Sequence, residues 1–189
     1  MALNTFYDKF ILTNNLKYKQ HNFFLGNLPF LICPAEVLIG LIETQDPGFE
    51  KKLYLAVRRS VANHLIPSFK VDFRYRGEKL AIFLERYFVA SGWGTISNVD
   101  LDLEGKKAIV HVSNNPVASR FHGRAESPRD HILRGVLAGI FSSVFQEPVH
   151  CVETHCVALG EADCEFIVKK PNEFDYSDKR VRTQLEVEI

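Results

Sequence analysis

Apolar residues recur with two different periods along this chain, and the two periods predict helices first and strands later. Across residues 47–67 the apolar positions lie three or four residues apart, which is typical of one buried helical stripe. Pro67 is expected to end this helix. The residues of the stripe are Tyr54, Val57, Val61 and Leu65.

Two longer segments, residues 78–90 and 128–145, also have the spacing of amphipathic helices. The first ends in a glycine-rich stretch around Trp93, where glycine can adopt the left-handed conformations of a helix exit. In the second, Gly135 and Gly139 are about one turn apart. They leave a smooth face that allows close contact with a strand, another helix or a ligand.

Strand patterns flank these helices. Two apolar runs within residues 22–33 are separated by Gly26-Asn27, which predicts a hairpin turn, and Pro34 is expected to begin a short helix. Residues 95–114 and 149–170 predict two more hairpins. Helices mixed with antiparallel hairpins favour an α+β fold, in which helices pack on an antiparallel sheet.

These patterns divide the chain into three expected parts. Residues 1–45 form a hairpin and helix, residues 46–170 form the main domain, and residues 171–189 form a polar arm. At the end of the arm, Leu185, Val187 and Ile189 alternate with glutamates, which predicts a short edge strand. We expect the arm to pair with a partner subunit or to fray.

Composition narrows the classes of function. The chain has 23 basic and 23 acidic side chains and a formal net charge of zero, so the basic excess of a nucleic-acid-binding protein is absent. No signal peptide is visible, and polar residues and prolines interrupt the most apolar stretch, so no membrane span is expected. We therefore expect a cytoplasmic protein whose four cysteines are reduced thiols or metal ligands.

The segment 132–168 carries an ordered set of motifs. A G-x-x-x-G helix, Gly135 to Gly139, precedes a strand in which Glu153 lies three residues before Cys156. A glycine turn follows, and then Cys164 two residues before an aromatic residue. This order resembles the 4-vinyl reductase domain family, and the resemblance extends over about residues 50 to 170.

The resemblance implies a fold shared with transport-particle subunits and nitric-oxide-sensing haem domains, a homodimer, and a cavity for a small hydrophobic molecule. In aromatic-sensing relatives, a histidine and a tryptophan near the pocket contact the polar group of the ligand. We expect the cavity between the helices at 50–66, 78–91 and 129–145 and the sheet. The candidate ligand-binding residues are Phe83, Tyr87, Phe88, Trp93, His111, Phe121, Leu137 and Phe141.

These features favour a small-molecule-binding or sensor module, for a hydrophobic or aromatic ligand, over an enzyme. One alternative is an accessory or catalytic role in modifying the vinyl groups of tetrapyrroles. A second is a ligand-free adaptor subunit. Haem is not expected, because no single histidine stands out as an axial ligand.

Cys156 and Cys164 lie on the two arms of a predicted hairpin, where paired positions are ~5 Å apart. Two thiolates and the Glu153 carboxylate are ligands that zinc accepts. Strand alternation would place Glu153 and Cys156 on opposite faces, so a bulge is needed to bring them together. In zinc-bearing members of the family a cysteine near the start of the helix supplies another ligand, and Asp130 stands near that place here. We expect a structural zinc ion at this set; the alternative is that the thiols are small buried apolar groups.

Overall fold

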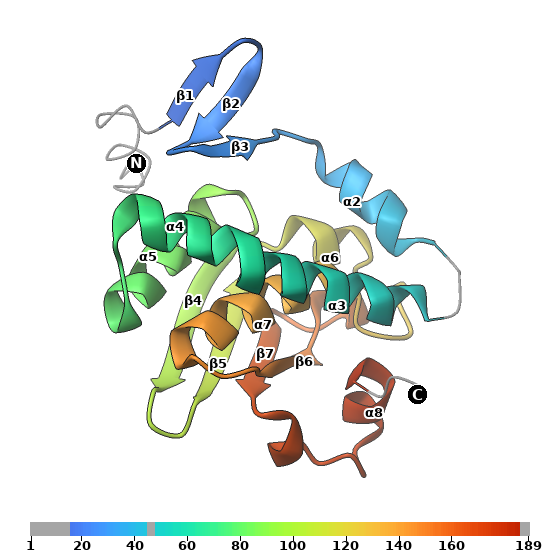
Figure 1. Ribbon diagram of the computed structural model, residues 1–189. Helices are drawn as coiled ribbons and strands as arrows, with labels where there is room; N and C mark the ends of the chain where they lie inside the picture. The colour runs from blue at the N-terminus through green and yellow to red at the C-terminus, as the bar shows by residue number, and fades with distance from the viewer. Residues whose placement is uncertain (1–15, 45–47, 186–189) are drawn as a thin grey trace.

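The computed structural model describes residues 16–44 and 48–185, which form two antiparallel sheets and a set of helices (Figure 1). The strands are β1 (Leu16–Lys19), β2 (Asn22–Leu25), β3 (Leu28–Phe30), β4 (Thr95–Asp102), β5 (Lys107–Ser113), β6 (His150–His155) and β7 (Cys164–Lys169). The α-helices are α2 (Ala35–Ile42), α3 (Phe49–Ser60), α4 (Ile66–Phe73), α5 (Gly77–Ala90), α6 (Pro116–Arg120), α7 (His131–Phe145) and α8 (Lys179–Leu185). The predicted α+β class is confirmed.

The first three strands form a small sheet of their own, in the order β1-β2-β3. Gly26, in the turn between β2 and β3, has φ +62°, a conformation that glycine adopts without strain. Asn27 donates to the Asp72 carboxylate of α4 from its backbone N (3.1 Å) and from Nδ2 (2.8 Å). The predicted hairpin is confirmed, and its turn attaches the small sheet to α4.

The helix predicted to end at Pro67 continues beyond it. A π-helical segment, Val61–Leu65, joins α3 to α4, and the Ile66 N–H donates to the carbonyl of Val61. Pro67 then lies in the first turn of α4, where a missing N–H removes little. The helix ends at Arg74 in the left-handed conformation. The predicted end was therefore wrong, because the π-helical segment lets a proline follow within the same rod.

The main sheet has the order β4-β5-β7-β6, with all neighbours antiparallel. The predicted hairpins at 95–114 and 149–170 are confirmed as the β4–β5 and β6–β7 pairs. The helix predicted from residue 128 begins instead at His131, after Asp130 as its N-cap residue. The difference arises because the Asp130 backbone, at φ −86° and ψ 45°, is not yet helical.

α7 is buried between the sheet and α3, so the molecule has a helix at its centre (Figure 1). A Cβ added to Gly135 would lie 2.8 Å from the carbonyl O of Tyr54, and one added to Gly139 would lie 2.6 Å from Cβ of Val61. The smooth face predicted for this helix therefore packs on another helix. No described helix is both long and apolar enough to span a membrane.

Side chains occupy the free edge of β6, which is an edge strand of the main sheet. The backbone N–H of Cys151 donates to Tyr54 Oη (3.1 Å), and the Cys151 carbonyl accepts from Nε and Nη2 of Arg134 (3.1 and 3.0 Å). The Gln184 amide of α8 bonds both backbone groups of Glu153, at 2.9 and 2.8 Å. Four backbone groups of this edge thus have side-chain partners.

The polar segment after residue 171 packs on its own chain as far as residue 185. α8 lies against β6, and its Val181 and Leu185 are buried. The predicted edge strand is wrong at Leu185, which is helical because residues 181, 184 and 185 form an apolar-edged helical stripe on β6. Val187 and Ile189 lie outside the described residues. The division into three parts stays a prediction.

Candidate metal and ligand sites

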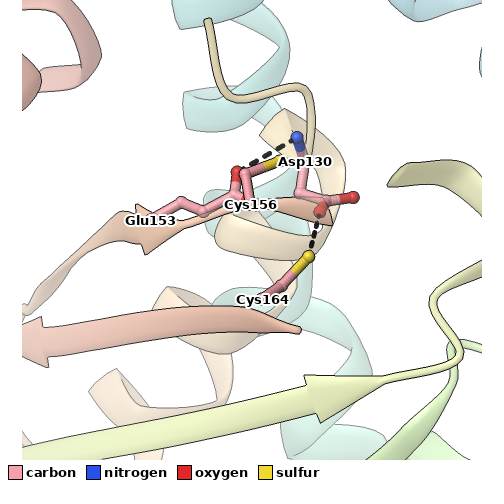
Figure 2. A group of neighbouring side chains, drawn as sticks. All are labelled: Asp130, Glu153, Cys156 and Cys164. Atoms are coloured by element: carbon pink, nitrogen blue, oxygen red, sulfur yellow. Dashed lines mark hydrogen bonds between the residues drawn. The ribbon is translucent and has the colours of Figure 1, made fainter. Parts of the chain in front are cut away.

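Asp130, Glu153, Cys156 and Cys164 converge at one buried point, as Figure 2 shows. One potential ligand atom from each lies within 4.8 Å of the others, and all four residues are buried. The group joins the start of α7, the end of β6 and the start of β7. These are the four residues that we predicted as metal ligands, and the structure brings them together.

The bulge that this convergence needs is present. The register of β6 against β7 shifts between Glu153 and His155, so Thr154 is the extra residue. β6 then ends at His155, and Cys156 follows outside the strand. The shift breaks the alternation of side chains and turns Glu153 and Cys156 towards the same point.

Asn115 holds Asp130 from behind. Its Nδ2 donates to Oδ2 of Asp130 at 2.9 Å, while its Oδ1 accepts from the backbone N–H groups of Val117 and Ala118 at 2.9 and 3.1 Å. The same side chain therefore caps α6 and orients a carboxylate of the cluster. Asn115 is itself buried, so both jobs are done away from water.

Burial and mutual proximity shift the titration of the cluster. Burial raises the pKa of Asp130. Burial, together with the neighbouring Asp130 and Cys156, raises the pKa of Glu153 well above its usual range. A hydrogen bond with Cys164 lowers the pKa of Cys156 to about 7, and the same contact and burial raise the pKa of Cys164. The protein thus crowds four acidic groups where negative charge is costly.

Two observations fit this cluster to a metal ion. Oε1 of Glu153 is buried and has no hydrogen-bond partner among the described residues, although buried carboxylate oxygens are nearly always paired. The donor set, two sulfurs and two carboxylates, matches what zinc binds in a tetrahedral site. A cation at this point would give Glu153 its missing partner and would offset the repulsion among the four groups.

A separate pocket of about 180 Å³ lies between α5, α7 and the strands β4 and β5. Its inner wall is formed by side chains that are almost fully buried, among them Leu84, Phe88, Val110 and Leu137. The full lining is apolar apart from two glutamates: Glu78, Ile82, Leu84, Glu85, Phe88, Ile96, Val99, Leu101, Val110, Leu137, Ile140 and Phe141.

Phe88, Leu137 and Phe141 are the predicted ligand-binding residues that line this pocket. The structure places three others in the aromatic packing around it: Phe83 and Tyr87 contact Phe69 of α4, and Trp93 stacks near Phe88. Their rings fill the core between helices.

His111 and Phe121, also predicted as ligand-binding residues, lie elsewhere. His111 is on β5 beside the carboxylates of Asp163 and Glu165, at 3.3 and 3.4 Å. Phe121 ends α6 beneath the Arg129 guanidinium, 5.8 Å from the ring centre. The structure therefore puts no histidine into the lining of the pocket.

The sequence reasoning missed the strand side of the pocket. Ile96, Val99, Leu101 and Val110 come from β4 and β5. Their alternation was a usable signal, because residues that alternate on paired strands face one side of a sheet. Aromatic residues were weighted instead.

Known proteins resemble this chain in sequence over a limited part. The family model of the 4-vinyl reductase domain matches residues 109–170, a range that includes all four residues of the metal cluster. The resemblance to this family is confirmed. An uncharacterised protein of Methanocaldococcus jannaschii is 33% identical over 69 residues. That match covers 32% of this chain and 43% of the relative, so the chain spans less than half the length of that relative.

Solved structures extend the likeness beyond the residues that the family model matches. The phenol-responsive sensory domain of the transcription activator PoxR, solved with phenol, superposes with a TM-score of 0.69. The superposition covers 92% of each chain at 13% identity, which shows a shared fold. A vinyl-4-reductase family protein from Methanocaldococcus jannaschii covers 74% of this chain and 83% of its own, with a TM-score of 0.43 and 18% identity.

Proposed function

We propose that this chain is a small-molecule-binding domain of the sensor type, and that its ligand is an apolar molecule about as large as one aromatic ring. The observation that carries the proposal is the pocket between α5, α7 and the main sheet. Ten of its twelve lining residues are apolar.

The size of the pocket sets the size of the ligand. An engineered cavity of about 150 Å³ lined by aliphatic and phenyl groups stays dry and binds benzene, and this pocket measures about 180 Å³. Pockets for drug-sized molecules measure roughly 300–1,000 Å³. A single ring or a short branched chain is therefore the ligand class that fits.

The fold likeness supports the same proposal. The PoxR sensory domain is described as phenol-responsive and was solved with phenol. A shared fold does not fix function, so the pocket itself carries the weight.

Filling the pocket tests this proposal. Val99→Phe should add a ring at the strand wall and abolish binding of benzene-sized probes, measured by NMR titration. Ile109→Phe is the matched control, because Ile109 lies on β5 next to Val110 and does not line the pocket. Equal probe binding by both variants would contradict the proposal.

We also propose that Asp130, Glu153, Cys156 and Cys164 hold a structural zinc ion. Four protein ligands complete a tetrahedral site and leave no position open for water, so the ion would serve as a cross-link. The orphaned Oε1 of Glu153 supports a cation at this point. Such an ion would tie the start of α7 to the β6–β7 hairpin.

Metal content tests this part. The wild type should hold one zinc per chain, and the Cys156→Ser, Cys164→Ser double variant should hold none, by elemental analysis of the purified protein. The other two cysteines provide the matched control: Cys151 is buried and Cys33 is exposed, and both lie outside the cluster. Loss of zinc in a Cys33→Ser, Cys151→Ser variant, or a wild type without zinc, would contradict the assignment.

The proposal includes a cytoplasmic homodimer, as the family resemblance implies. Large apolar side chains at the surface, such as Leu31, Ile32 and Val71 at 88%, 77% and 76% exposure, support an association surface. Light scattering on the eluting protein should give twice the mass of the 21.6 kDa chain. A monomer at micromolar concentration would contradict it.

A further inference from the structure

We propose that the pocket selects amphiphilic cations, that is, small ligands with an apolar body and a protonated amine. This inference rests on the proposed function, since it names the ligand class of the same pocket. The feature behind it is the position of two carboxylates, Glu78 and Glu85, in an otherwise apolar lining.

The pocket has a deep end and an outer end. Leu84, Phe88, Val110 and Leu137, at 1–2% exposure, form its inner wall. Ile82 is 43% exposed and also lines the pocket. The outer end therefore lies along the exposed side of α5, where a ligand would still meet water.

Both carboxylates stand at that outer end. Glu78, Ile82 and Glu85 are four and three residues apart on α5, so they lie on one face of the helix. Glu78 and Glu85 are exposed, and both line the pocket. An apolar body in the deep end would thus place its outermost group between two negative charges.

The chemistry of the lining points to a cation. It contains no lysine, arginine or histidine, and no hydroxyl or amide side chain. Among the described residues, neither Glu78 nor Glu85 forms an ion pair. An anionic head group would be repelled here, a neutral one would gain little, and an ammonium group would be attracted.

Helix stability explains one of these glutamates and not the other. Glu78 lies in the first turn of α5, where an acidic side chain favours the helix dipole. Glu85 lies in the middle of the helix, where that effect is absent. Its place beside an apolar pocket is what a binding role would require.

Three ligands with one phenyl body and different head groups test the inference: 2-phenylethylamine, 2-phenylethanol and phenylacetate. By calorimetric titration at pH 7, the amine should bind the wild type roughly five- to tenfold more tightly than the alcohol, which is the scale of exposed charge pairs. Phenylacetate should bind most weakly. The preference for the amine should shrink in high salt, because salt screens exposed charges.

A double variant isolates the carboxylates. Glu78→Gln, Glu85→Gln should bind the amine and the alcohol equally and keep the wild-type affinity for the alcohol. The matched control is Glu36→Gln, Glu43→Gln, which removes two exposed carboxylates that are also seven residues apart, at α2. This control should keep the preference for the amine.

Each outcome has one reading. Equal binding of amine and alcohol by the wild type, or a preference that survives in the Glu78, Glu85 variant, would overturn the inference and leave the proposed function standing. If none of the three ligands binds the folded wild type, the proposed function falls and the inference falls with it.

Discussion

Single residues do two jobs at the metal cluster, and Asn115 shows this most clearly. Its amide oxygen caps α6, and its amide nitrogen donates to Asp130. Partners of this kind orient metal ligands, and their loss typically weakens metal binding 10- to 100-fold. The two jobs can be separated because a serine caps a helix nearly as well as an asparagine does.

We therefore expect Asn115→Ala to lower the free energy of unfolding by about 1 kcal/mol, through the lost cap, and to weaken zinc binding as well. Asn115→Ser should keep most of the stability and still bind zinc more weakly, because it lacks the donor to Asp130. Chelator competition and urea unfolding measure the two effects. Unchanged zinc affinity in both variants would show that Asn115 serves the helix alone.

At the same scale, sequence reasoning found all four residues of the cluster but not their geometry. Alternation in β6 separates Glu153 from Cys156, and a bulge at Thr154 reunites them. The need for a bulge was predictable from the odd spacing; its position was not, because it depends on the pairing with β7. Asn115 was missed as a partner because its contact with Asp130 crosses the loop between α6 and α7.

Between elements, the contact of α7 with α3 depends on glycine. Gly139 brings the two helices together so closely that an added Cβ would lie 2.6 Å from Cβ of Val61 and 2.9 Å from the carbonyl O of Arg58. The carbonyl belongs to the backbone, so it cannot move aside as a flexible side chain could. Gly40 of α2, by contrast, has no atom within 4 Å of an added Cβ.

Gly139→Ala should therefore lower the free energy of unfolding by about 1–3 kcal/mol through overpacking. Gly40→Ala makes the same chemical change in an open helical position, and it should raise that free energy by up to about 1 kcal/mol, because alanine favours the helix. Urea unfolding of the two variants compares them directly. The same sign of change in both would contradict the proposed contact.

The helices were predictable in their existence, and their ends were less so. Residues 78–90 have a helical stripe and a glycine exit, and α5 matches them closely. Pro67 is a strong stop signal, but a π-helical segment made it the start of α4. Hydrogen bonds of that kind depend on the packing of the whole rod against α7, which a local pattern does not contain.

For the molecule as a whole, stability should depend on pH through His150. Its ring lies 3.1 Å from Tyr54 Oη and 3.2 Å from Nη1 of Arg58, and burial, followed by the charges of Arg58 and Arg134, lowers its pKa to about 4. Between that value and the ordinary 6.5, the unfolded chain binds a proton that the folded chain does not.

The contribution of His150 to stability should thus be complete above pH 6.5 and should decline as the pH falls towards 4. The decline is at most about 1.4 kcal/mol per pH unit, a ceiling because the ring is partly exposed. His150→Gln should remove this slope, while His64→Gln, at an exposed helical position, should keep it. Denaturant unfolding at several pH values measures it, and parallel curves for the wild type and His150→Gln would contradict it.

The occupied edge of β6 limits how copies of this chain can associate. Unpaired backbone groups at a sheet edge invite another strand, which is a common route to aggregation. Here Tyr54, Arg134 and Gln184 already bond the groups of Cys151 and Glu153 that an incoming strand would use. An intermolecular sheet continuous with the main sheet would have to start from β4 at the opposite edge. The strand that carries Glu153 is thereby kept out of any such pairing.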